Sequence, residues 1–161
     1  MNWPVILLTY FNLFFYGLLY NSRSALLPEL MHFFSLDHSQ IGLLYTLSSL
    51  CGLFINIFAF WWLRKFTTIV PMRCSLLLSS LCSFFIYFSG QNINSTLFFI
   101  SFLCIGLSAP LSTISMNILI RSNTEVHKRR KIYSALHSFY GLASLMAPLC
   151  LVLFKNWQQI F

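Results

Sequence analysis

The sequence predicts an all-α fold, a multi-span bundle of five transmembrane helices with the N-terminus in the cytoplasm. Of the 161 residues, 58% are hydrophobic and only 8% are charged, whereas soluble domains average about 25% charged residues. The apolar residues form long uncharged stretches, and the basic residues gather between them. A chain this short exposes much of its surface, and its few charges cannot cover that surface in water. Lipid is therefore the expected solvent.

Five stretches are long and apolar enough to cross the ~30 Å hydrocarbon core as helices. Residues 74–120 carry no charged side chain and are too many for one crossing. The segment 90–94, GQNIN, has the composition of a turn and divides this stretch into two spans. Pro110 and Pro148 fall inside spans and are expected to kink them. The predicted spans, within a single domain of residues 1–161, are residues 3–20, 38–62, 71–89, 95–120 and 132–154.

The basic residues set the predicted orientation. With the N-terminus inside, eight of the ten Lys and Arg residues fall in two cytoplasmic connections, at 64–73 and 121–131. This bias is typical of cytoplasmic loops. The expected location is the plasma (inner) membrane, with several passes through it. The bias also explains the net charge of +7 without a nucleic-acid partner. Arg23 and Lys155 lie outside, and Arg23 is expected to extend to the membrane interface, with a ligand role as the alternative.

Chemical motifs are scarce. The five cysteines are irregularly spaced inside apolar stretches, so we interpret them as small packing residues. The histidines are scattered, so we predict no metal and no cofactor. No carboxylate lies within a span, and His137 has no nucleophile pattern beside it, so we predict that the chain is not an enzyme. Asp37 and Gln40 have the spacing of a capping box that opens the second span.

Polar side chains recur at helical spacing on four of the five spans. Small and hydroxyl residues at such positions usually serve helix packing. For Asn12, Asn56, Asn117 and His137, cavity lining and structural hydrogen bonding remain open alternatives. The third span offers only serines and Cys82. The stripes are Asn12, Tyr16, Tyr20 and Arg23; Tyr45, Ser49, Gly52 and Asn56; Gly106, Pro110, Thr113 and Asn117; and Ser134, His137, Gly141, Ser144 and Pro148.

Three local segments resemble a known family. Residues 23–30, RSALLPEL, are similar to the junction between the first and second spans of major facilitator superfamily transporters. Residues 137–143, HSFYGLA, resemble the fifth-span motif, especially in fucose-permease-like sugar transporters. Residues 156–161, NWQQIF, resemble the start of the sixth span. The chain as a whole therefore resembles the N-terminal half of such a transporter. The segment 61–68, WWLRKFTT, corresponds to the family loop after the second span but lacks the acid and the glycines of that loop. The charge interaction by which the family loop holds one conformation is therefore in doubt for this chain.

The resemblance implies that spans one, two, four and five line a central cavity and that the third is peripheral. The carboxylate positions of fucose-permease-like members fall on Ser24 and Thr113, which leaves His137 as the only intramembrane group able to exchange a proton near neutral pH. Asn21 falls where those members place a sugar-contacting asparagine. The predicted solute-binding residues are Asn21, Tyr16, Tyr45, Asn56, Thr113, Asn117 and His137.

These features predict part or a remnant of a secondary transporter for a small polar, sugar-like solute. The bilayer and the solute are the expected partners. The chain ends where a sixth span begins, so truncation is the favoured expectation. Pairing with a second half-transporter and self-association are the alternative hypotheses. The alternative function is a small membrane protein that does not transport but interacts or assembles with another membrane protein.

Overall fold

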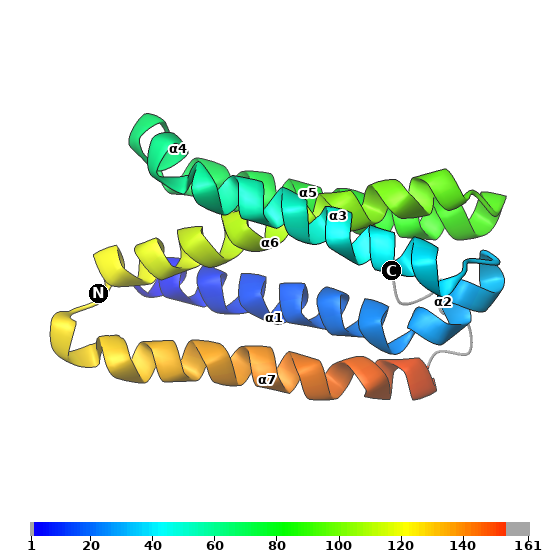
Figure 1. The fold of residues 1–161 in the computed structure, drawn as a ribbon. Coiled ribbons are helices and arrows are strands. Elements are labelled where there is room, and N and C mark those ends of the chain that lie inside the picture. The colour runs from blue at the N-terminus through cyan, green and yellow to red at the C-terminus, as the bar shows by residue number, and fades with distance from the viewer. Residues whose placement is uncertain (1, 154–161) are drawn as a thin grey trace.

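The computed structural model describes residues 2–153, and every regular element in that range is helical (Figure 1). Residue 154, Lys155 and the segment 156–161, on which parts of the sequence predictions fall, lie outside the described residues. The elements are α1 (Trp3–Ala25), α2 (Leu27–Phe33), α3 (His38–Ile57), α4 (Ala59–Lys65), α5 (Ile69–Asn92), α6 (Ser95–Asn123), the short 3₁₀ turn η1 (Val126–Lys128) and α7 (Arg129–Leu153).

Within residues 2–153, four helices are long and apolar enough to cross a membrane, namely α1, α3, α5 and α6. They correspond to the first four predicted spans. The fifth predicted span coincides with α7, which has 25 residues and is therefore about 37 Å long. Its length suffices for a crossing, but its first turn is basic, and it is not among the helices that are apolar enough by composition.

The second predicted span, 38–62, is wrong as a single helix. The chain ends α3 at Ile57, passes through Phe58 and starts the short helix α4 at Ala59. The indole N–H of Trp62 donates a hydrogen bond to the carbonyl oxygen of Ile55 at 3.2 Å. This bond satisfies a carbonyl in the last turn of α3, where intrahelical donors run out, and Trp62 is itself buried.

At the end of the bundle away from Trp62, local sequence signals determine where the helices begin and end. Asp37 and Gln40 form the predicted capping box, with the Gln40 backbone N–H donating to Asp37 Oδ1 at 2.7 Å. The chain turns within the predicted segment 90–94, but later than its first residue, because α5 continues to Asn92 and ends where Ile93 adopts a left-handed conformation with φ 48°. The Asn94 side-chain oxygen then caps α6 by accepting from two backbone N–H groups of its first turn.

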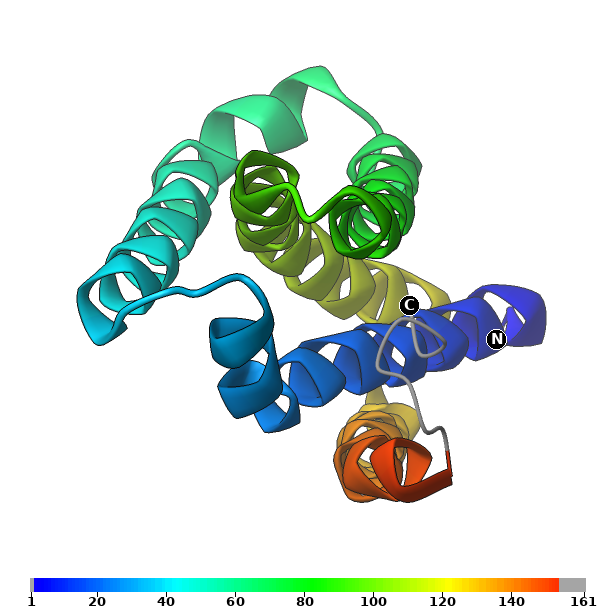
Figure 2. The same ribbon diagram turned by 90° about the vertical axis from the view of Figure 1, so that its right-hand side faces the viewer.

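The helices form two groups that share α1. Helix α6 packs along α5 and α3, and α7 packs along the other side of α1. Figure 2 shows α1 between α7 and the α3, α5 and α6 group. One buried cluster joins α1, α6 and α7 through Ile6, Leu13, Met116, Ile120 and Leu136. A second cluster joins α2, α3 and α6 through Leu30, Leu44, Phe98 and Phe102.

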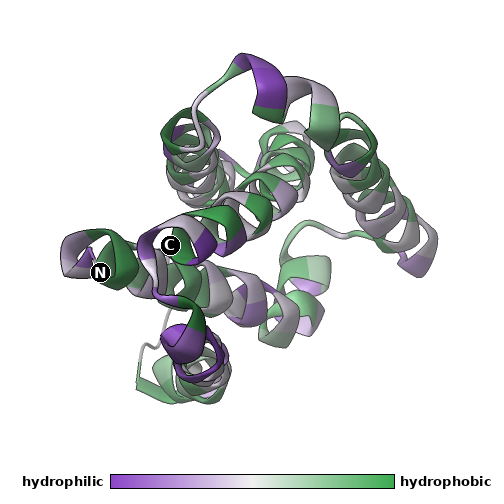
Figure 3. Cartoon of the chain, turned by 90° about the vertical axis from the view of Figure 1, so that its left-hand side faces the viewer, coloured by the Kyte–Doolittle hydropathy of each residue, from purple (hydrophilic) through white to green (hydrophobic). Residues whose placement is uncertain are grey.

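The basic residues gather at one end of the bundle. The start of α1, helix α4 and the connection from α6 to α7 lie at one end, whereas α2 and the turn between α5 and α6 lie at the other (Figure 1). Seen from the first end, hydrophilic ribbon lies near α4 and along the connection into α7 (Figure 3). The two basic segments of the sequence, 64–73 and 121–131, therefore meet at the same end of the molecule.

Candidate functional site

A polar cavity of about 420 Å³ lies between α1, α3 and α6. This volume falls within the range of about 300–1,000 Å³ that is usual for small-molecule sites. Hydroxyl, amide and guanidinium groups share its wall with aliphatic side chains. The lining residues are Tyr16, Tyr20, Arg23, Tyr45, Ser48, Ser49, Gly52, Leu53, Asn56, Ile105, Gly106, Ala109, Pro110 and Thr113.

Helix α3 contributes the longest polar side of this cavity. Tyr45, Ser49, Gly52 and Asn56 follow one another at steps of three or four residues and therefore share one face of the helix. All four line the cavity, so the polar stripe predicted for the second span lies on one wall of the cavity. Ser48 lines the same wall and was not identified in the sequence, although it lies three residues after Tyr45.

Helices α3 and α6 contact each other beside the cavity through a close approach of their backbones. A Cβ added at Gly106 would meet the carbonyl oxygen of Ser48 and would lie 2.7 Å from its Oγ. Pro110 has no N–H, so the Gly106 carbonyl lacks its usual intrahelical donor. That oxygen lies 3.2 Å from the position of a Cβ on Gly52. The expected packing role of Gly52 and Gly106 is therefore confirmed.

Helix α1 places aromatic hydroxyls and one cation on the cavity. Tyr16, Tyr20 and Arg23 line it, as their spacing predicts, whereas Asn12 of the same stripe turns to α6 and donates to Ser112 Oγ at 3.1 Å. Within residues 2–153, the hydroxyls of Tyr16, Tyr20 and Tyr45 make no hydrogen bond. These groups can therefore donate to or accept from a solute.

The prediction that Arg23 extends to the membrane interface is wrong, because its side chain is only 1% exposed. Helix α1 continues to Ala25, and Leu26 and Leu30 pack with Phe102 across its end. The Arg23 Cζ lies 4.1 Å from the centroid of the Phe102 ring. It also lies 5.2 Å from the Tyr20 ring and 5.6 Å from the Tyr45 ring. The cation is thus enclosed by three aromatic rings.

The seven predicted solute-binding residues do not all meet. Tyr16, Tyr45, Asn56 and Thr113 line the cavity between α1, α3 and α6. Asn21 lies between α1 and α7, where its amide nitrogen donates to the Gly17 carbonyl oxygen at 2.6 Å and to Ser144 Oγ at 3.0 Å. The remaining two predicted residues, Asn117 and His137, are exposed on α6 and α7 and are not among the residues that line this cavity.

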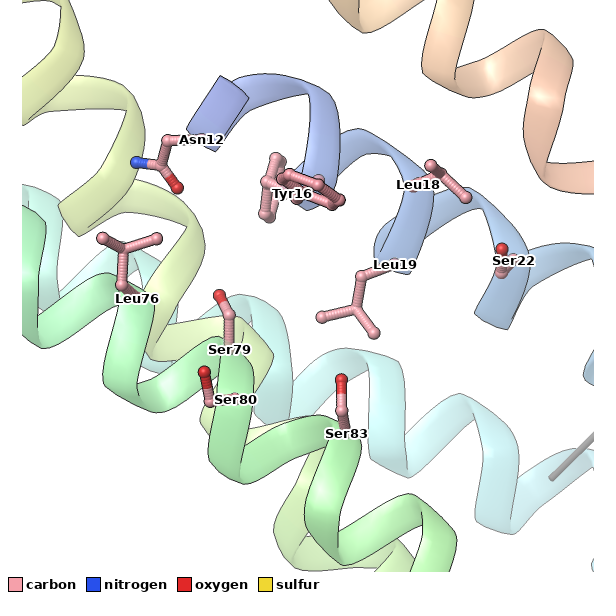
Figure 4. A pocket seen from close by; sticks show the side chains of 10 residues that line it. Asn12, Tyr16, Leu18, Leu19, Ser22, Leu76, Ser79, Ser80 and Ser83 are labelled. Carbon is pink, nitrogen blue, oxygen red and sulfur yellow. The ribbon is translucent and has the colours of Figure 1, made fainter. Parts of the chain in front are cut away.

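The predicted third span, α5, carries serines on the side that faces α1. A second cavity, of about 460 Å³, lies between α1 and α5. Figure 4 shows Ser79, Ser80 and Ser83 of α5 on the side that faces α1, opposite Asn12 and Tyr16. Tyr16 lines both cavities. The polar groups that α5 contributes to this cavity are serine hydroxyls, as the sequence predicts for the third span, and serines at steps of three or four residues lie on one helical face.

Groups with redox or metal-binding chemistry are dispersed. The five cysteines are free, and Cys82 packs as a buried small residue with Ile86 and Ile105. In the part of the chain that the structure describes, no three His, Cys, Asp or Glu side chains gather as metal ligands would. The polar cavity offers hydrogen bonds and one positive charge.

The fold and the cavity define a multi-pass membrane protein with a polar cavity between apolar helices. Comparison with protein families identifies it more closely. The model of the Major Facilitator Superfamily matches residues 9–161, and the chain belongs to that superfamily. No individual curated protein and no solved structure matches the chain. The superfamily consists of secondary transporters, so membrane transport is the function that the family defines for this chain.

Proposed function

We propose that the chain forms one side of the transport path of a secondary transporter, and that the cavity between α1, α3 and α6 binds a small, hydroxyl-rich, sugar-like solute. The observation that carries this proposal is the convergence of Tyr16, Tyr45, Asn56 and Thr113 from three helices on one cavity. Their hydroxyl and amide groups match the hydrogen-bonding groups of such a solute. Sites of this kind in transporters lie between helices near the membrane midplane.

The proposal includes a topology. Helices α1, α3, α5, α6 and α7 would be five successive spans of one domain in the plasma (inner) membrane, with the N-terminus cytoplasmic. The basic segments 64–73 and 121–131 lie at the same end as the start of α1 (Figure 1), which supports this orientation through the positive-inside rule. Addition of a membrane-impermeant thiol label to intact cells would test it, with single cysteines placed at Ser39 and Thr67 of a cysteine-free chain. Labelling only of the Ser39 position is expected.

A second half is needed to complete the path, because alternating access moves two halves around one site. Asn117 and His137 are exposed on α6 and α7. An amide and an imidazole facing lipid are costly, so we propose that this surface faces a second half-transporter or a second copy of the chain. Asn21 joins α1 to α7 and would keep this surface in place, with contact to the solute as its further predicted role.

Binding to the purified chain in phosphatidylcholine nanodiscs tests the cavity. Galactose is the probe, and isothermal titration measures its affinity. Tyr45→Phe removes one cavity hydroxyl, and a neutral hydrogen bond contributes about 0.5–1.5 kcal/mol, so we expect affinity to fall about two- to tenfold. Tyr87→Phe is the matched control, because Tyr87 is exposed on α5 and is absent from the cavity wall.

A second matched pair uses threonine. Thr113 Oγ1 donates to the Ala109 carbonyl oxygen at 3.0 Å, and Thr46 Oγ1 donates to the Gly42 carbonyl oxygen at 2.8 Å. The two hydroxyls thus make the same local bond, but only Thr113 lines the cavity. Thr113→Val should weaken galactose binding and Thr46→Val should not. Equal affinities for all four variants and the unmodified chain would contradict the proposed site.

A further inference from the structure

Arg23 carries a buried charge that lacks a counterion in residues 2–153. Its Nε and Nη1 atoms are enclosed, with no hydrogen-bond acceptor. The whole sequence has three acidic residues. Glu125 pairs with His127 and Lys128, Asp37 caps α3, and Glu29 is exposed on α2. The ion pairs found in the described chain do not include Arg23.

The surroundings of Arg23 stabilise its charge but do not use its hydrogen bonds. A guanidinium keeps its proton in proteins and presents five N–H donors in a planar fork. The rings of Tyr20, Tyr45 and Phe102 attract the cation through their faces. Arg23 also lies in the last turn of α1, where the helix dipole favours a positive charge. Neither interaction supplies acceptor oxygens to the enclosed nitrogens.

We propose that Arg23 anchors an oxyanion group, a carboxylate or a phosphate, of the solute that enters the cavity between α1, α3 and α6. An ionisable group inside a membrane bundle points to a substrate pathway when it lines a cavity, and Arg23 lines this one. The planar fork matches the paired oxygens of either group. The inference rests on the proposed function and narrows its solute class from neutral polar molecules to anionic ones.

The cavity places neutral polar groups within reach of an anchored anion. Tyr45 lies beside the guanidinium, and Ser49 follows it by one turn of α3, a rise of about 6 Å. Ser48 and Thr113 line the same space. A solute whose anionic group binds Arg23 would therefore present its hydroxyls to these side chains. A sugar acid combines both features in one small molecule.

The test compares galactose with galacturonate, which differs in carrying a carboxylate, and with inorganic phosphate. Binding of each is measured by titration to the chain in phosphatidylcholine nanodiscs. We expect galacturonate to bind more tightly than galactose, and Arg23→Gln to reduce the ratio of their affinities about tenfold or more, because charged hydrogen bonds are lost. Phosphate binding should fall likewise. Arg23→Lys keeps the charge without the fork and should give an intermediate ratio.

Arg64→Gln is the matched control. The Arg64 Cζ lies 4.3 Å from the centroid of the Phe60 ring, much as Arg23 lies over Phe102, but Arg64 is exposed and outside the cavity. Its substitution should leave the ratio unchanged. Helical circular dichroism checks folding, and we expect Arg23→Gln to fold, because it removes an unpaired buried charge. If Arg23→Gln does not fold, Arg23→Lys provides the test. An affinity ratio of galacturonate to galactose in Arg23→Lys that equals the ratio in the unmodified chain would contradict the proposal.

The other outcomes separate the two proposals. If galactose binds through Tyr45 and the affinity ratio does not depend on Arg23, the oxyanion anchor is overturned and the neutral-solute site stands. If the Arg23 effect is present but Tyr45→Phe leaves galactose binding unchanged, the anchor stands and the neutral-sugar site is lost. If soluble anions do not bind, and phosphatidylglycerol stabilises the unmodified chain but not Arg23→Gln, the anion is a lipid headgroup and the solute anchor is overturned. Absence of all binding overturns both.

Discussion

Substitution of Gly106 by alanine should destabilise the contact between α3 and α6. The added Cβ would meet the Ser48 carbonyl oxygen and would lie 2.9 Å from the carbonyl carbon. These atoms belong to the backbone of α3, so they cannot rotate away, and the two helices must separate. Ser48 and Gly106 are both buried, so this movement disturbs packing on either side of the contact.

The magnitude follows from two opposing contributions. Overpacking a well-packed core costs about 1–3 kcal/mol, and backbone contact places Gly106→Ala in the upper half of that range. Alanine in place of glycine within a helix contributes about 0.5–1 kcal/mol of stability. The free energy of unfolding should therefore fall by roughly 1–2.5 kcal/mol. Gly42 provides the matched control on α3, because outside the local backbone of its own helix nothing lies within 4 Å of its added Cβ.

Reversible unfolding in mild detergent, driven by SDS and followed by helical circular dichroism, measures both variants. Gly42→Ala should gain about 0.5–1 kcal/mol, while Gly106→Ala should lose stability, so the two substitutions have opposite signs. Galactose binding should weaken in Gly106→Ala as well, since Gly106 lines the cavity. Equal stability of the two variants would refute the close approach of α3 and α6.

Three further predictions concern single interactions. Ser112→Ala removes the acceptor of the Asn12 amide and should lower the SDS-unfolding free energy by about 0.6–1.7 kcal/mol; no change would mean that the bond contributes nothing. Asp37→Ala should cost about 0.5–2 kcal/mol through loss of the α3 cap in the same assay. The hydrogen bond from Lys128 lowers the pKa of Glu125 below its ordinary 4.5. The stability from this carboxylate is thus present above about pH 4.5 and is lost as pH falls through the lowered value. Lys128→Met should raise the Glu125 pKa in a carboxyl NMR titration, and an unchanged titration would contradict this attribution.

The helices themselves follow from local sequence. Hydrocarbon thickness sets the length of an apolar helix, so the uncharged stretches predict α1, α5 and α6 to within a few residues. Caps and turns are equally local, as Asp37 and Asn94 illustrate. The break at Phe58 could not be predicted in this way, because the bond from Trp62 to Ile55 forms only after the chain has turned.

The polar stripe on α3 could also be predicted from the sequence, since spacing alone puts Tyr45 and Asn56 on one face of the helix. Spacing does not say which neighbour that face meets. Asn12 precedes Tyr16 by four residues, a step that also separates residues lining the cavity, yet Asn12 donates its hydrogen bond to Ser112. His137 shares its stripe with Ser144, yet the structure leaves one exposed and places the other against Asn21.

The sequence by itself determined that this protein is a helical membrane bundle, because the transfer of side chains into lipid depends on composition over about 20 consecutive residues. Only the tertiary structure decided the position of Arg23. Its burial depends on α2 folding over the end of α1 and on Phe102 of α6 lying beneath the guanidinium. Residues far apart in the chain create that environment, so no local pattern around position 23 encodes it.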